Sequence, residues 1–132
     1  MSEYKYKNEI IQRVNRARAL THNWDTYEGL PTEAKCADKL RDILLQLQPA
    51  WLPHVSPLND GGMQAEFSYK RCVLEIVVES VGEPYFYYAN ISGCGDECAS
   101  VENNLEDITM LLYEMRLKHE VINSYPTRTT YV

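Results

Sequence analysis

Apolar residues recur at the three- and four-residue spacing of an amphipathic helix in two stretches of the N-terminal third. In residues 3–20 the apolar positions are Ile10, Ile11, Val14, Ala17 and Leu20. The second stretch begins near Pro31 and Thr32, which are typical of a helix N-terminus. Its apolar positions are Ala37, Leu40, Ile43, Leu44 and Leu47. The pattern stops at Pro49, so the sequence predicts two helices before residue 50.

The middle of the chain changes to the two-residue alternation that is typical of β-strands. Apolar and polar residues alternate over residues 63–69 and again over 72–79, with a two-residue reversal between them. Shorter extended segments are expected at 55–58 and 84–90, and the turn-forming residues 59–62 separate the first two strands. These segments predict an antiparallel β-meander of three to four strands.

The C-terminal part predicts one more helix. Residues 91–100 contain two glycines and two cysteines and are expected to form a loop, and a helix is expected over 101–121. We expect residues 123–132 to form a flexible tail. The chain is therefore expected to be a single α+β domain over residues 1–132. It would have two N-terminal helices, the meander and one C-terminal helix packed on one sheet face.

The charge balance limits the classes of partner. The 132-residue chain has 13 Lys and Arg against 19 Asp and Glu, which gives a formal net charge of −6 and a sequence pI near 5.0. Nucleic-acid binding needs clustered cations, so we expect no nucleic-acid partner. The one basic run contains Arg13, Arg16 and Arg18 and is interpreted as a solvated helix face. No apolar stretch has the length of a membrane span, so no membrane association is expected.

Four cysteines, at positions 36, 72, 94 and 98, bear on the cellular compartment. The first residues lack the apolar segment of a signal peptide, so we expect a cytoplasmic protein, or one in the host cytoplasm if a phage encodes it. The thiols would then be reduced. Cys94 and Cys98 have the spacing of half a tetrahedral zinc site, and a disulfide between cysteines is the other alternative. Ordinary thiols are the favoured interpretation, and no metal or cofactor is predicted.

Candidate acid–base residues gather at His22, Asp25 and Glu28. No nucleophile motif and no phosphate-binding glycine loop accompanies them. We therefore predict no enzymatic activity. A small enzyme or ligand-binding protein with a site near these three residues is kept as an alternative.

Tyrosine dominates the aromatic residues, with ten Tyr against two Trp and two Phe. Alternation over 84–90 separates Tyr85 and Tyr87 from Phe86 and Tyr88. If the latter two face the core, the other face carries Tyr85 and Tyr87 together with Glu66, Val73, Glu75 and Val77. An apolar face rimmed by glutamates is typical of a contact surface. The sequence leaves open whether another part of the chain covers it.

Two short motifs support a resemblance. They are Asn23-Trp24-Asp25-Thr26-Tyr27 followed by Pro31, and Asp60-Gly61-Gly62 followed by Glu66-Phe67. Over about residues 20–80 the chain resembles a group of small, largely uncharacterised bacterial and phage proteins with these features. The resemblance implies a compact α+β domain in a bacterial or phage setting, and it implies no activity.

These observations lead to the expectation of a non-enzymatic, acidic protein-binding module whose partner is a protein with a basic surface. Its concrete form would be an inhibitor of the antitoxin, immunity or phage counter-defence (anti-CRISPR-like) type. The expected contact residues on the sheet are Tyr85, Tyr87, Glu66 and Glu75. A second acidic set consists of Asp96, Glu97, Glu102, Glu106 and Asp107. The remaining alternative is a homo-oligomeric structural protein, with a homodimer formed through the tyrosine-bearing face.

Overall fold

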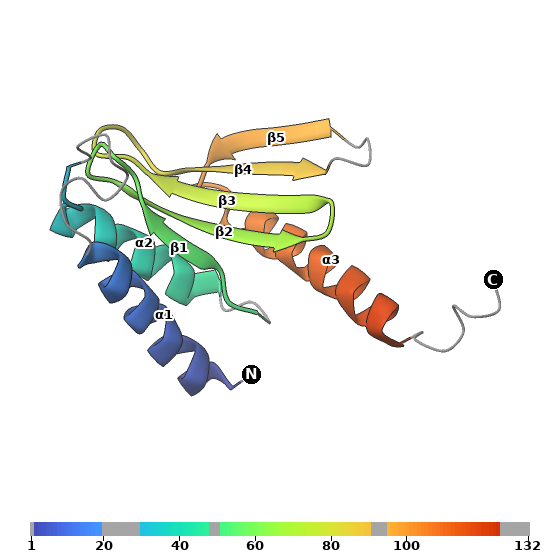
Figure 1. The fold of residues 1–132 in the computed structure, drawn as a ribbon. Coiled ribbons are helices and arrows are strands. Elements are labelled where there is room, and N and C mark those ends of the chain that lie inside the picture. Colours follow the sequence, from blue (N-terminus) through green and yellow to red (C-terminus); the bar gives the residue numbers. More distant parts are fainter. Residues whose placement is uncertain (1, 20–29, 48–50, 91–94, 125–132) are drawn as a thin grey trace.

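The computed structural model describes residues 2–19, 30–47, 51–90 and 95–124, with the backbone alone for residues 95 and 116–124. Over these residues the chain forms three helices and a five-stranded antiparallel sheet (Figure 1). The elements are α1 (Glu3–Arg18), α2 (Ala34–Leu47), β1 (His54–Pro57), β2 (Met63–Tyr69), β3 (Cys72–Val78), β4 (Tyr85–Asn90), β5 (Gly95–Ser100) and α3 (Leu105–Ser124). The predicted α+β class is confirmed. None of the described helices has the length and apolar character needed to cross a membrane.

The sheet has the strand order β1-β2-β3-β4-β5, and the helices lie on one side of it. In Figure 1 all three helices are below the sheet, with α1 beside β1 and α2 under the central strands. We call the side that faces the helices the helix face and the other side the open face. No described helix lies on the open face.

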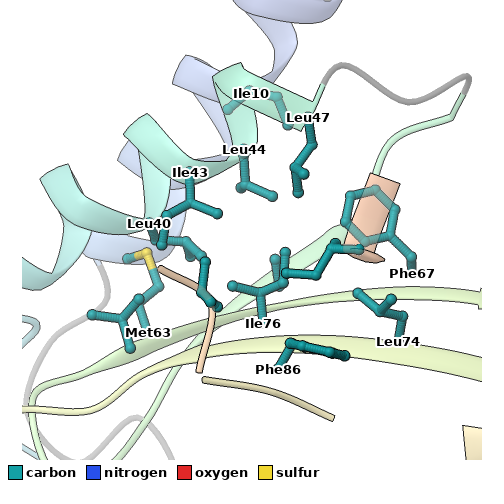
Figure 2. Close-up of a cluster of buried hydrophobic side chains, with 14 of the residues drawn as sticks. Ile10, Leu40, Ile43, Leu44, Leu47, Met63, Phe67, Leu74, Ile76 and Phe86 are labelled. Carbon is teal, nitrogen blue, oxygen red and sulfur yellow. The ribbon is translucent and has the colours of Figure 1, made fainter. Parts of the chain in front are cut away.

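The hydrophobic core lies between the three helices and the helix face, and Figure 2 shows the part of it that lies beside α2. The side chains of α2 that point towards the sheet are Leu40, Ile43, Leu44 and Leu47, at the spacing that the sequence predicts. The sheet contributes Met63, Phe67, Leu74, Ile76 and Phe86, all with an exposed fraction of 0%. Because burying one such side chain contributes about 1.5–3 kcal/mol, this layer is the main source of the stability of the fold.

Tyr6 attaches the first helix to α2. This residue lies before Ile10, where the predicted apolar pattern starts. Ser2 caps α1 by accepting a hydrogen bond from the backbone N–H of Lys5 at 3.1 Å. Tyr6 is buried, and its hydroxyl donates to the carbonyl oxygen of Leu44 at 3.1 Å. Burial raises the pKa of Tyr6. The Tyr6 hydroxyl therefore stays protonated and joins the two N-terminal helices.

The strand count of three to four is wrong, because residues 95–100 form a fifth strand instead of the predicted loop. Strand β5 pairs with β4 from Tyr85 opposite Ser100 to Asn90 opposite Gly95. The sequence Gly-Asp-Glu-Cys-Ala-Ser has little intrinsic preference for a strand, so pairing with β4 decides its conformation. The last helix consequently begins at Leu105 and not at residue 101. Strand β2, by contrast, has the predicted bounds.

The turn between β1 and β2 holds three segments of the chain together. Asp60 accepts two hydrogen bonds, at Oδ1 from the N–H of Gly62 at 2.8 Å and at Oδ2 from the N–H of Ser80 at 3.2 Å. The hydroxyl of Ser80 donates to Oε2 of Glu33 at 2.7 Å. A Cβ atom at Gly62 would overlap the carbonyl oxygen of Val78, so this position requires glycine. The Asp-Gly-Gly motif is thus explained by packing.

Candidate protein-binding face

Four of the predicted contact residues, from three strands, meet on the open face. Glu66 of β2 lies directly opposite Glu75 of β3, and Glu75 lies opposite Tyr87 of β4. Tyr85 lies two residues before Tyr87, opposite Val77. Side chains paired directly across strands have Cβ atoms about 4.5–5.5 Å apart. Glu66, Glu75, Tyr85 and Tyr87 therefore form one continuous surface, which we call the Tyr–Glu patch.

No ion pair among the described residues neutralises the negative charge of the Tyr–Glu patch. Burial raises the pKa of Glu75, and the neighbouring carboxylate of Glu66 raises it further. The four ion pairs found among the described residues involve α1, α2 or the residue just before α2, and none includes Glu66 or Glu75. His54 lies opposite Glu66 at the edge of the sheet and forms no ion pair within that part of the chain.

The tyrosines of the patch are held as neutral phenols. The hydroxyl of Tyr87 donates to Oδ2 of Asp96 at 2.8 Å, and this hydrogen bond is the main reason that the pKa of Tyr87 is raised. Tyr85 is half-buried, and burial, followed by the charge of Glu79, raises its pKa. Both hydroxyl groups therefore remain protonated at neutral pH beside the carboxylates.

The structure divides the second acidic set among four places. Asp96 lies on the open face, whereas Glu97 is opposite Tyr88 in the strand register and so belongs to the helix face. Glu102 follows β5, and Glu106 and Asp107 are in the first turn of α3. Negative charge in that turn also stabilises the helix dipole. Of the five residues, only Asp96 adjoins the Tyr–Glu patch.

Sequence reasoning missed the contribution of β5 to the open face. In the register with β4, Cys98 lies opposite Tyr87 and Ser100 lies opposite Tyr85. The available signal is Ala99, a small apolar residue that lies opposite the buried Phe86 and is followed by the polar Ser100. Such a short alternation predicts a strand only once β4 is known to lie beside it.

Several predicted residues lie outside the described part of the chain, namely His22, Asp25, Glu28 and Cys94, as does the motif of residues 23–27. The zinc and disulfide alternatives for Cys94 and Cys98, and the favoured interpretation as ordinary thiols, therefore stay predictions from the sequence. Cys36 and Cys72 are buried thiols, and Cys98 is an exposed one. In the residues that the structure describes, no group of three or more His, Cys, Asp or Glu could hold a metal ion.

No protein-family model, curated protein or solved structure matches the chain.

The chemistry of the Tyr–Glu patch comes from two carboxylates and two phenol hydroxyls on neighbouring, hydrogen-bonded strands. Carboxylates attract cations and accept hydrogen bonds, and phenol rings offer flat apolar area with a polar tip. Such a surface is suited to contact with a basic one.

Proposed function

We propose that the protein is a non-enzymatic, acidic protein-binding module that docks on a basic surface of another protein through the open face of its sheet. The observation that carries the proposal is the direct pairing of Glu66 with Glu75 on that face, next to Tyr85 and Tyr87. Its role would be that of an inhibitor of the antitoxin, immunity or phage counter-defence type. It would cover a basic surface that otherwise binds nucleic acid.

The glutamate pair is unfavourable in the free protein. Like charges directly opposite each other in neighbouring strands destabilise a sheet, and cross-strand pairs are worth about 0.2–1 kcal/mol. Departures from the rules of stable folding are typical of functional sites. A lysine or arginine of a partner would neutralise Glu66 and Glu75 together. The repulsion in the free protein would then become attraction in the complex.

The tyrosines add contact area to the charge. Tyr is enriched at protein interfaces because its ring is large and rigid and its hydroxyl forms hydrogen bonds. The faces of Tyr85 and Tyr87 also suit the cation–π contacts that arginine and lysine make. The net charge of −6 would speed association with a basic partner through electrostatic steering.

The second acidic set would extend this surface unequally. Asp96 adjoins the patch and would contact the partner directly. Glu97, Glu102, Glu106 and Asp107 lie elsewhere and would act through steering, whose effect falls with added salt. We place this binding in the cytoplasm of a bacterium, or of a phage-infected host cell.

The test compares a patch variant with a variant of equal charge. Wild-type protein and the E66Q/E75Q variant are used to capture proteins from a bacterial lysate, and a basic protein retained only by the wild type is purified. Its affinity for each variant is then measured by calorimetry at two salt concentrations. We expect E66Q/E75Q to lower the affinity about tenfold or more, because truncating one partner of a buried charge pair costs about 2–5 kcal/mol. Added salt should weaken wild-type binding.

The matched control is E3Q/E114Q, which removes two exposed glutamates from α1 and α3, on the helix side of the sheet. It should leave the affinity within about threefold, because a rim or surface charge contributes little. Equal losses in both variants would contradict the proposal, as would the failure of every basic candidate to depend on Glu66 and Glu75. A wild-type dimer that Y85D/Y87D dissociates without unfolding would favour the homo-oligomeric alternative.

A further inference from the structure

A separate group of charged side chains lies where α1 meets the edge of the sheet. Arg13 and Arg16 are three residues apart, so they are neighbours on one face of α1. Together with His54 of β1 they line a groove of about 420 Å³, and Ala17 and Val55 complete its wall. Three side chains that can carry positive charge thus converge in a chain whose net charge is −6.

Arg13 is held in place beside the groove. Its Nη1 atom donates to the carbonyl oxygen of Pro53 at 2.9 Å. Its Nε atom lies 3.8 Å from Oε1 of Glu9, is buried, and has no hydrogen-bond partner within the described residues. The fold therefore positions the guanidinium group, and within the described residues its Nε–H has no acceptor.

Arg16 and His54 are the two ionisable groove side chains that form no ion pair among the described residues. Both side chains are exposed. The acidic groups nearby are Glu9, which is set against Arg13, and Glu66, which lies opposite His54 in the strand register. No acidic side chain among the described residues forms an ion pair with Arg16. Within the described residues, the groove therefore presents one guanidinium that has no ion pair, beside one that the fold holds in place.

We infer that this groove binds a phosphate group, either as inorganic phosphate or on a phosphate monoester. Guanidinium groups form paired, charge-assisted hydrogen bonds with phosphate oxygens. A carboxylate ligand fits the groove less well than a phosphate, because it has only one charge and two oxygens. Glu9 also already supplies one carboxylate to Arg13. A phosphate monoester carries about −1.5 to −2 charges and three free oxygens, so it can use Arg16 and His54 as well. The inference does not rest on the proposed protein-binding role.

The test titrates isotope-labelled protein with sodium phosphate, phenyl phosphate or acetate at constant pH and ionic strength, with chloride as the balancing anion. Nuclear magnetic resonance follows the backbone amides and the arginine Nε–H groups. We expect saturable shifts at Arg13, Arg16 and β1 with both phosphates and weaker effects with acetate. Saturation with phenyl phosphate alone would identify a monoester as the ligand, and saturation with both would show that free phosphate suffices.

The matched variants are R16Q and K7Q, which each remove one exposed positive charge from α1. Lys7 does not line the groove. R16Q should raise the dissociation constant for phosphate about threefold or more, and K7Q should change it less than twofold. The inference is wrong if chloride or acetate gives the same shifts as phosphate, or if R16Q and K7Q weaken binding equally. Circular dichroism checks that both variants are folded.

Discussion

The two faces of the sheet are built from alternate residues of the same strands, and they follow different rules. On the helix face, Phe67, Leu74 and Ile76 are fully buried against the helices. On the open face, their neighbours Glu66 and Glu75 place like charges directly opposite each other. The helix face is therefore packed in a way that stabilises the fold. The open face keeps a pair of like charges that lowers stability.

The polar groups of the molecule show the same contrast. At the β1–β2 turn, both carboxylate oxygens of Asp60 accept backbone hydrogen bonds, and Glu33 accepts one from Ser80. Glu66 and Glu75 have no ion pair among the described residues. A carboxylate with satisfied oxygens fastens segments together, whereas one without a partner is available to another molecule. This difference separates acidic residues that maintain the fold from those proposed to bind.

The largest effect is expected from truncating the helix face. Phe67→Ala should lower the free energy of unfolding by about 3–5 kcal/mol, because it removes buried apolar area and leaves a cavity in the core. Phe67 also packs edge-on against Trp51, with ring centroids 5.9 Å apart. Urea denaturation followed by circular dichroism measures the change.

Val73→Ala is the matched truncation on the open face, where Val73 is half-buried opposite Ala89. It should cost about 1 kcal/mol or less. Equal losses for the two truncations would contradict the distinction between a packed face and an open one.

An intermediate effect is expected at the β1–β2 turn. Asp60→Ala should lower the free energy of unfolding by about 1–3 kcal/mol, because the N–H groups of Gly62 and Ser80 lose their acceptor. Asp42→Ala removes an exposed carboxylate that pairs with Arg41 and should change stability by about 0.5 kcal/mol at most. Thermal unfolding of both variants measures the difference. The structural role of Asp60 would be wrong if it tolerated the change as well as Asp42 does.

A smaller effect is expected from pH. The pKa of Glu75 is raised in the folded protein above its ordinary value of 4.5. Between the two values the folded state binds more protons than the unfolded state, so stability falls as pH rises through this window. Wild-type protein should therefore lose stability relative to E75Q as the pH increases from 4.5 through the raised pKa. Parallel stability profiles across that range, measured by urea unfolding at successive pH values, would contradict the prediction.

The sequence predicts those elements of the fold whose patterns are local. The apolar stripe of α2 and the alternation of β2 and β3 carry their own periodicity, and the two-residue reversal at Lys70, whose φ is 51°, sets the register between the strands. Strand β5 depends on pairing with the neighbouring strand β4, and the burial of Tyr6 depends on Leu44, which is 38 residues away in the chain. Pairing with β4 and a hydrogen bond to Leu44 decide them, and neither leaves a local signal.

The candidate site also has a part that the local sequence pattern predicts and a part that it does not. A strand repeats every two residues, so alternation predicts that Tyr85 and Tyr87 share a face, and a fixed register adds Glu66 and Glu75. Alternation does not indicate which face the helices cover, since that depends on how α1, α2 and α3 pack. The hydrogen bond from Tyr87 to Asp96 also escapes prediction, because it requires β5.

The most direct test of this account is a double-mutant cycle of E66Q, E75Q and E66Q/E75Q, with the free energy of unfolding measured at neutral pH and low salt. The account predicts that each substitution stabilises the protein and that the two glutamates repel each other with a coupling of about 0.2–1 kcal/mol. The same double variant should lose affinity for the basic partner. Destabilisation by both single substitutions, with attractive or zero coupling, would show that the fold uses these charges for stability and would contradict the account.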